Sequence, residues 1–593
     1  MSIAVTDLRI EHGGEALGLG TPRPRLSWRL AGPSGWRQAS AEIALDTASG
    51  ATETVVLDTT DQVLVDWPFA DLGSRERVEV RVRVTGLDGS VSPWSRPEPV
   101  ETGLLLASDW QARPVGGAWA EEPGTDRRPS RVRRGFRLDA PVVSARLYAT
   151  AHGVFEAEVN GVRVGDDELS PGWTSYDARL RYRTYDVTEL LVAGDNVVGA
   201  WLGDGWYRGR LGFNGGYHDL YGTDLSFLAQ LEVELADGRR VVVATDDRWE
   251  AQPSPIAFSG LYDGERHDLR LDGDGWSIAG ADDDGWTPVA LAERDPSTLV
   301  APEQPPVRCT EEVAPVAHRT TPRGTVVLDF GQNLVGRLRI TVDGDTGHEI
   351  TLHHAEVLQD GELYRRTLRL AAAEDVVILR GDGPTTWEPR FTVHGFRYAE
   401  ITGWPGEFDP SAVVARVLHT DMERTGWFTS SDPGLNRLHE NVLWSTRGTS
   451  STSPPTARSA TSVWAGRVTS RCSRPPPPSC STARGCSAPG CRTSRSTSCP
   501  TAPCRGSCRG SPAARRGSRS SRARSGATRP CSRPGPSGSV SATPACWPGS
   551  GVPRRPGSTS SCREPERTGS GTRASSSATG STRRPRRTTR PTR

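Results

Sequence analysis

The sequence feature that most constrains the fold is a change of composition where Gly448 meets Thr449. From residue 449 to residue 593 the chain contains no Leu, Ile, Phe, Tyr or Met, and 27 Arg stand against two acids, Glu564 and Glu566. A segment with so few large apolar side chains cannot bury enough surface to offset the entropy lost on ordering. We therefore expect residues 449–593 to form a disordered Arg/Ser/Pro/Cys-rich tail, with every folded core before it.

The segment just before this boundary is typical of a helix. Asp432 can cap a helix N-terminus with its carboxylate, and the Pro that follows it suits the first helical position. Leu435, Leu438 and Val442 then recur at helical spacing. We predict a helix over Asp432–Arg447 whose apolar face packs against a large domain.

Charge divides the chain at the same place. The formal net charge of the whole chain is +1, but the tail carries +25 and residues 1–448 carry −24. The acidic part gives no sign of a nucleic-acid or membrane surface. The tail could bind RNA or DNA electrostatically. Its cysteines could suggest zinc, since Cys504 and Cys508 lie four residues apart, but the others keep no paired spacing and no His accompanies them. The chain contains no Lys, and the tail consists of the residues that GC-rich codons produce when they are read out of frame. We therefore interpret the tail as the product of a shifted reading frame, in preference to a nucleic-acid-binding or zinc-binding segment.

The N-terminus and the cysteine usage predict a location. Residues 1–7 lack the basic and apolar regions of a signal peptide, and no apolar run approaches the length of a membrane span. Cys309 is the single cysteine before the tail, which suits a reducing compartment. We expect a cytoplasmic protein with no cofactor, no metal, and no nucleic-acid or membrane partner.

A mainly β fold is predicted, with three tandem β-sandwiches over residues 1–405. In residues 1–106, the stretch from Val78 to Val84 alternates Val with charged residues, as in an immunoglobulin- or fibronectin-III-like sandwich. Residues 107–300 hold short strands between Gly/Asp turns, and Asn160-Gly161 is typical of a tight hairpin. Residues 301–405 begin with a Pro-rich linker and return to strands, and residues 406–448 are linker and helix.

Several residues of the second predicted domain are candidates for carbohydrate binding. Aromatic faces can stack on sugar rings, and a carboxylate can accept hydrogen bonds from sugar hydroxyl groups. The candidates are Trp173, Tyr176, Asp204, Trp206 and Tyr207. Aromatic residues also dominate sandwich cores, and Asp beside Gly commonly bonds its own turn, so core packing and a turn remain the favoured alternatives.

Two groups of potential metal ligands carry less weight. Five aspartates, at positions 272, 274, 282, 283 and 284, lack the regular spacing and closing Glu of a calcium loop. His353 and His354 are neighbours on a predicted strand, where adjacent side chains point to opposite faces. We predict no metal site from either group.

Specific stretches along residues 1–448 carry a family resemblance. They are Leu26-Ser27-Trp28, Val159-Asn160-Gly161, Pro171-Gly172-Trp173-Thr174-Ser175-Tyr176, Leu202-Gly203-Asp204-Gly205-Trp206-Tyr207-Arg208-Gly209, Tyr262-Asp263-Gly264-Glu265, Asp329-Phe330-Gly331-Gln332-Asn333, His354-Ala355-Glu356-Val357-Leu358, His394-Gly395-Phe396-Arg397-Tyr398 and Asn441-Val442-Leu443-Trp444-Ser445. In this order they resemble the N-terminal two-thirds of a bacterial α-L-rhamnosidase of glycoside hydrolase family 78.

The resemblance implies a domain plan and a reaction. Residues 107–300 would be the rhamnosidase N-terminal sandwich and residues 301–405 a concanavalin-like sandwich, followed by an (α/α)6 barrel of which residues 432–447 would be the first helix. The family removes terminal α-L-rhamnose with inversion, which needs two carboxyl groups on opposite sides of the sugar. A rhamnose-containing glycoside or polysaccharide would be the partner.

The acidic residues that the family places after this helix are missing here. The family pattern runs Asp-x-Pro-Thr-Asp-Cys-Pro-Gln-Arg-Asp-Glu-Arg, and the chain does not contain it, so we assign no catalytic residue. If residues 449–467 are translated back into GC-rich codons and the reading frame is moved one base earlier, however, the DNA can encode that pattern. We therefore hypothesise a single-base loss near codon 449 and a truncated, inactive hydrolase. The alternatives are a non-catalytic carbohydrate-binding module and, more weakly, a nucleic-acid binder that acts through the tail.

Overall fold

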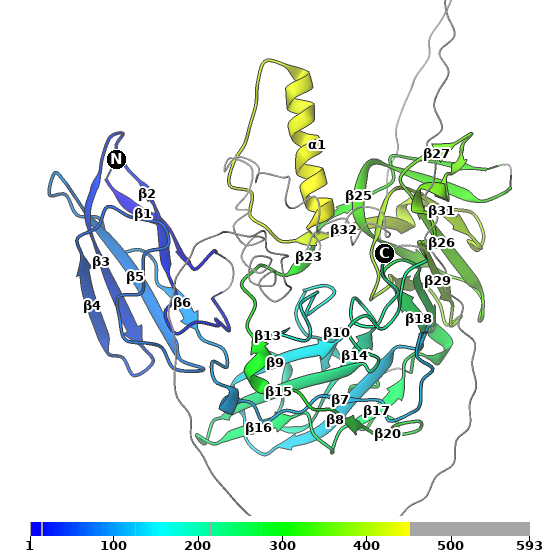
Figure 1. The fold of residues 1–593 in the computed structure, drawn as a ribbon, viewed down its shortest axis with the longest axis horizontal. Helices are drawn as coiled ribbons and strands as arrows, with labels where there is room; N and C mark the ends of the chain where they lie inside the picture. The colour runs from blue at the N-terminus through cyan, green and yellow to red at the C-terminus, as the bar shows by residue number, and fades with distance from the viewer. Residues whose placement is uncertain are drawn as a thin grey trace, which may run out of the picture. The chain divides into compact units, whose positions relative to one another are not determined.

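The computed structural model describes residues 2–450 except 14, 15, 125, 213, 214, 274 and 322. The predicted disordered tail, apart from Thr449 and Ser450, lies outside the described residues, as does any nucleic-acid or zinc site within it. The regular structure of the described part is mainly β-strand with short 3-10 helices, and its one α-helix, α1 (Pro433–Thr449), comes at the end, as Figure 1 shows. The mainly β architecture predicted from the sequence is confirmed.

The first module is a small two-sheet sandwich. Strands β1 (Ala4–Ile10) and β2 (Leu26–Ala31) form one antiparallel pair. The second sheet, visible in Figure 1, has the order β4-β3-β5-β6, with β3 at Gln38–Thr47, β4 at Thr52–Leu57, β5 at Arg77–Gly86 and β6 at Glu98–Glu101. Alternate residues of β5, from Val78 to Val84, point into the core and are buried, because the side-chain period of a strand is two.

The second module consists of two six-stranded sheets around one apolar core. The first sheet has the order β11 (Val162–Arg163), β10 (Val154–Val159), β14 (Gly194–Gly203), β8 (Ser130–Leu138), β17 (Glu250–Pro253) and β20 (Thr287–Pro288). The other has the order β13 (Arg183–Asp186), β9 (Val142–His152), β15 (Ser226–Leu235), β7 (Val115–Gly116) and β21 (Ala290–Leu291), with β16 (Arg240–Ala244) paired to β15. A short parallel pair, β12 (Leu180–Arg181) and β22 (Leu299–Val300), lies outside both sheets.

The predicted hairpin at Asn160-Gly161 is confirmed. Val159 of β10 pairs with Val162 of β11, which leaves two residues in the turn. Asn160 has φ 50° and Gly161 has φ 80°, and both residue types tolerate this left-handed backbone at low cost.

The third module is one ten-stranded sheet that recruits strands from the preceding region. Its main order is β18 (Ile256–Gly260), β19 (Gly264–Asp268), β29 (Glu374–Ile378), β26 (Glu349–Ala355), β31 (His394–Thr402), β25 (Val326–Val342), β32 (Val413–Thr420) and β23 (Val307–Val313). Strands β24 (Ala317–Thr320) and β30 (Thr385–Trp387) pair with β25, and β27 (Leu358–Gln359) with β28 (Glu362–Leu363) forms a separate hairpin. Strands β18 and β19 fall within residues 107–300 and β32 lies beyond residue 405, so this sheet crosses the linear domain boundaries drawn from the sequence.

The predicted C-terminal helix is confirmed. The carboxylate of Asp432 accepts hydrogen bonds from the backbone N–H groups of Gly434 (2.7 Å) and Leu435 (3.3 Å), which caps the first turn. Trp444 packs against the core of the third module, but Leu435, Leu438 and Val442 are exposed. Within the described ranges, no helix is long and apolar enough to span a membrane.

Candidate functional site

Four of the five candidate carbohydrate-binding residues, all but Asp204, lie within or against one aromatic cluster of the second module. Tyr176, Trp206 and Asp204 are buried, and Trp173 and Tyr207 are only partly buried. Buried side chains offer no surface to a ligand, so three of the five serve the interior of the domain. Carbohydrate binding through Trp173 and Tyr207 stays a prediction.

Asp204 pairs with a neighbouring cation in the protein interior. Its carboxylate accepts a hydrogen bond of 2.5 Å from Nε of Arg208, four residues along the chain, and both side chains are almost fully buried. Burial raises the pKa of Asp204 above its ordinary value, and Arg208 opposes that rise. The pair of Asp204 with Arg208 therefore holds the Gly203–Gly209 loop. The sequence favoured a different role for Asp204, a hydrogen bond between its side chain and the backbone of its own turn.

Trp173 and Tyr207 are held by neighbouring rings. Nε1 of Trp173 donates a 3.0 Å hydrogen bond to the hydroxyl of Tyr221. Tyr207 stacks on the imidazole of His152, with ring centroids 5.0 Å apart, and meets Tyr176 edge-on. These contacts fix both rings and leave part of each at the surface.

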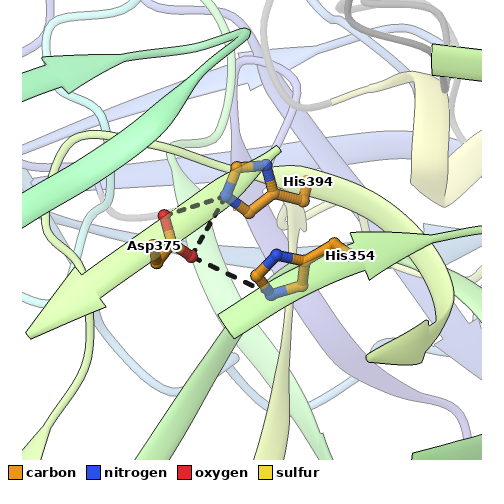
Figure 2. A group of neighbouring side chains, drawn as sticks. All are labelled: His354, Asp375 and His394. Atoms are coloured by element: carbon orange, nitrogen blue, oxygen red, sulfur yellow. Dashed lines mark hydrogen bonds and ion pairs between the residues drawn. The ribbon is translucent and has the colours of Figure 1, made fainter. Parts of the chain in front are cut away.

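A cluster that sequence reasoning missed lies inside the third module, where His354, Asp375 and His394 meet (Figure 2). They come from the neighbouring strands β26, β29 and β31, and all three are buried. Nε2 of His394 donates to both carboxylate oxygens of Asp375, at 3.0 and 3.1 Å. His353, the sequence neighbour of His354, faces Glu374 at 3.2 Å on the opposite side of the strand, as its position in a strand predicts.

The tautomer of His354 follows from its contacts. Nδ1 lies 3.2 Å from the carbonyl oxygen of Ala373, which can only accept, so Nδ1 carries the proton. Nε2 is then an acceptor 3.8 Å from Oδ2 of Asp375. Burial lowers the pKa of His354 to about 3, so the ring is neutral near pH 7.

The cluster fits a hydrogen-bonded core better than a metal site. The two imidazole rings are stacked with centroids 4.3 Å apart and planes 22° apart. A nitrogen lone pair lies in its ring plane, so two nearly parallel rings cannot both direct a lone pair at one nearby ion. Asp375 is also engaged, because it accepts from His394 and from the backbone N–H of Glu265 (3.0 Å).

A polar pocket lies where the second and third modules meet. It has a volume of about 580 Å³. It is lined by Glu156, Arg163, His267, Leu269, Asp272, Arg337, Arg380, Asp382, Pro384, Thr385, Thr386, Trp387, Glu388 and Arg390. The lining side chains come from β10, β11, β19, β25 and β30, from the segment after β19 and from the loops after β29 and β30. Because these segments are far apart in the sequence, no local pattern could reveal the pocket.

Two ion pairs join the two modules, and one of them links two residues that line the pocket. Arg390 donates to Glu156 at 2.8 Å, and Arg337 of β25 donates to Glu168 at 2.8 Å. Burial alone would raise the pKa of Glu168, but the guanidinium groups of Arg337 and Arg163 hold it below its ordinary value. The Glu168 carboxylate is therefore ionised near pH 7 while these partners are in place.

These features define a protein of tandem β-sandwiches whose second and third modules share a sheet and a polar junction. Residues 5–106 match the Rha78A-like N-terminal immunoglobulin domain, residues 140–311 the alpha-L-rhamnosidase N-terminal domain, and residues 319–419 the bacterial alpha-L-rhamnosidase concanavalin-like domain. The chain therefore carries the three N-terminal domains of the bacterial α-L-rhamnosidases, in the order in which their models match.

Relatives and solved structures agree with this assignment. An alpha-L-rhamnosidase of Streptomyces avermitilis is 43% identical over 364 residues, which are 60% of this chain and 34% of that protein. One of Alteromonas sp. is 35% identical over 75% of this chain and 50% of its own length. The crystal structure of an α-L-rhamnosidase from Aspergillus terreus superposes with a TM-score of 0.75 at 42% identity, over 77% of this chain and 54% of that one. The Streptomyces avermitilis enzyme complexed with L-rhamnose gives a TM-score of 0.73 at 30% identity, over 77% of this chain and 62% of its own. The chain thus spans about a third to three-fifths of the length of these relatives.

Proposed function

We propose that this chain carries the N-terminal, non-catalytic half of an inverting α-L-rhamnosidase that removes terminal α-L-rhamnose from glycosides. The observation that carries the proposal is the order of the three matched domains, which together extend from residue 5 to residue 419. The relatives that share these domains are named alpha-L-rhamnosidases.

The exposed face of α1 supports a missing catalytic domain. Leu435, Leu438 and Val442 form an apolar stripe that is exposed in the described part of the chain. A stripe of this kind normally packs against other helices. We infer that α1 is the first helix of the catalytic barrel and that the helices meant to cover its stripe are encoded in another reading frame after codon 449.

We propose in consequence that the 593-residue chain hydrolyses no rhamnoside. Inversion needs a protonated acid for the leaving oxygen and a base for the attacking water, about 6.5–9.5 Å apart. The family places these acids after the helix, in the stretch that the shifted frame replaces. The cytoplasmic location predicted from the sequence stays a prediction.

Incubation of the purified chain with an aryl α-L-rhamnoside tests this proposal. We expect no release of the aryl alcohol above the rate of a heat-treated sample. Turnover that survives repurification of the 593-residue product would show that the acids lie elsewhere in this chain.

A further inference from the structure

A second and larger hollow, which we call the acidic groove, has a volume of about 1540 Å³. It shares no lining residue with the polar pocket, so it is a separate place in the molecule. Ion pairs of Arg9 with Glu423 and of Arg308 with Asp166 join the segments that form it. The lining comes from within residues 10–25, 104–105, 165–186, 297–308 and 420–423.

Part of the lining of the acidic groove is apolar and only half covered. Leu17, Leu19, Leu105 and Tyr185 line the groove, and each is partly buried. The Pro-rich segment 302–306 lies beside them in the lining. Apolar side chains in this state gain free energy when a further apolar group covers them.

The charges that line the acidic groove are mainly negative. Among the described residues, seven carboxylates and four guanidinium groups line it. The side chains of Asp166, Asp421 and Glu423 are 73%, 46% and 50% exposed, and Glu303 is also exposed. A cationic segment arriving from solvent can therefore reach these carboxylates.

The described part of the chain ends beside the acidic groove. The backbone N–H of Thr420, which lines the groove, donates a 2.8 Å hydrogen bond to the carbonyl oxygen of Ser450. From there the sequence continues to residue 593, with 27 Arg against two acids. A strongly basic segment thus leaves the described fold next to an acidic surface.

The first part of that segment matches the groove in its chemistry. Residues 458–468 hold two cations, Arg458 and Arg467, and two adjacent apolar residues, Val463 and Trp464. A residue spans at most about 3.6 Å, so the roughly eight residues that precede this stretch reach up to about 29 Å. A short tether of this kind gives an effective concentration on the order of millimolar.

We propose that the acidic groove is the docking site of residues 458–468 of the same chain. The guanidinium groups of this stretch pair with the exposed carboxylates, and its Val and Trp side chains cover the half-buried apolar lining. The inference does not depend on the proposed hydrolase function, because it uses only the groove and the basic segment of this chain.

Modification of arginines with phenylglyoxal, read by peptide mass spectrometry on the full chain, tests the inference. An effective concentration on the order of millimolar and a Kd on the order of 0.1 mM leave about a tenth of the stretch undocked. In about 20 mM salt, Arg458 and Arg467 should therefore react about tenfold more slowly than Arg583 and Arg584. In about 0.5 M salt, where the screening length falls to about 4 Å, the difference should shrink to about twofold or less. Equal rates in low salt would overturn the inference.

Matched double variants locate the docking. Asp166→Asn with Glu303→Gln removes two charges from the groove and should raise the reactivity of the two protected arginines to that of the distal pair. Asp195→Asn with Glu53→Gln removes two exposed charges that do not line the groove and should leave the protection unchanged. Equal loss of protection in both double variants would overturn the inference, because it would show a diffuse attraction to the whole acidic body.

Dilution distinguishes the chain's own segment from that of a second copy. Docking within one chain does not depend on protein concentration, so the protection should survive a dilution of about a hundredfold. Protection that disappears on dilution would overturn the inference and assign the groove to the basic segment of a second copy.

Discussion

Breaking the buried ion pair between Arg337 and Glu168 should destabilise the junction of the second and third modules. Both side chains are 1% exposed, and their closest atoms are 2.8 Å apart. Arg337→Met leaves the Glu168 carboxylate buried with Arg163 as its nearest remaining partner, at 3.3 Å. Removal of one partner of a buried pair typically costs about 3–5 kcal/mol, because the other charge is left without compensation. We expect a loss in that range.

Urea unfolding followed by tryptophan fluorescence measures this loss as a shift of the midpoint. The double variant Arg337→Met with Glu168→Leu removes both charges and should recover much of the stability, so the two effects should not add. The matched control is Arg137→Ala, which breaks a surface pair with Asp195 whose side chains are 68% and 66% exposed and should cost less than about 1 kcal/mol.

An Arg337→Met cost as small as that of Arg137→Ala would refute the reasoning. It would mean that the two modules do not depend on this pair, and that the sheet shared through β18 and β19 alone joins them.

Three further results are expected. Burial lowers the pKa of His267 and of His354 to about 3 and raises the pKa of Glu265 to about 7. Between pH 4.5 and 6.5 the unfolded chain therefore holds a proton on each of these two histidines, whereas the folded chain holds one proton among the three groups, on Glu265. Because the unfolded chain binds more protons, the urea midpoint should rise with pH. A flat or falling profile would contradict these assignments. Asp432→Ala removes the cap of α1 and should cost that helix about 1 kcal/mol, seen as lost helical signal in circular dichroism, whereas an unchanged spectrum would show that the cap is dispensable. Gly264→Ala adds a Cβ at φ +105° against a backbone carbonyl of β29 and should lower the thermal midpoint through a cost of about 1–3 kcal/mol; a midpoint equal to the parent's would count against so close an approach of the two strands.

Local chemistry was enough to predict many of the elements. The alternation in β5, the Asn160-Gly161 turn and the Asp432 cap each depend on residues close together in the sequence, and each is confirmed. Period-two and helical patterns report which side chains share a face, and turn residues report where a strand ends.

Strand pairing over long distances could not be predicted in this way. Strand β19 pairs in parallel with β29, more than a hundred residues later, and nothing in its local pattern specifies that partner. This pairing brings His267 to the polar pocket. A separate antiparallel pairing sets β29, which carries Asp375, beside β26, which carries His354. Sequence reasoning considered the adjacent residues His353 and His354 and therefore missed the contact of His354 with Asp375 and His394.

The buried state of Asp204 was also beyond local reasoning. A Gly-Asp-Gly stretch is typical of an exposed turn, but here Arg208 supplies an internal partner that makes burial tolerable. Whether a polar residue faces solvent depends on its partners in the fold, and these come from the assembled domain.

Hydrolysis by a frame-restored gene tests the central claim most directly. One base is inserted before codon 449, the product is purified, and its action on an aryl α-L-rhamnoside is followed by NMR. We predict release of rhamnose with inversion at the anomeric carbon, and loss of that activity when the restored Asp-Glu carboxylates are replaced by amides. A restored protein that folds and releases no rhamnose would contradict the claim.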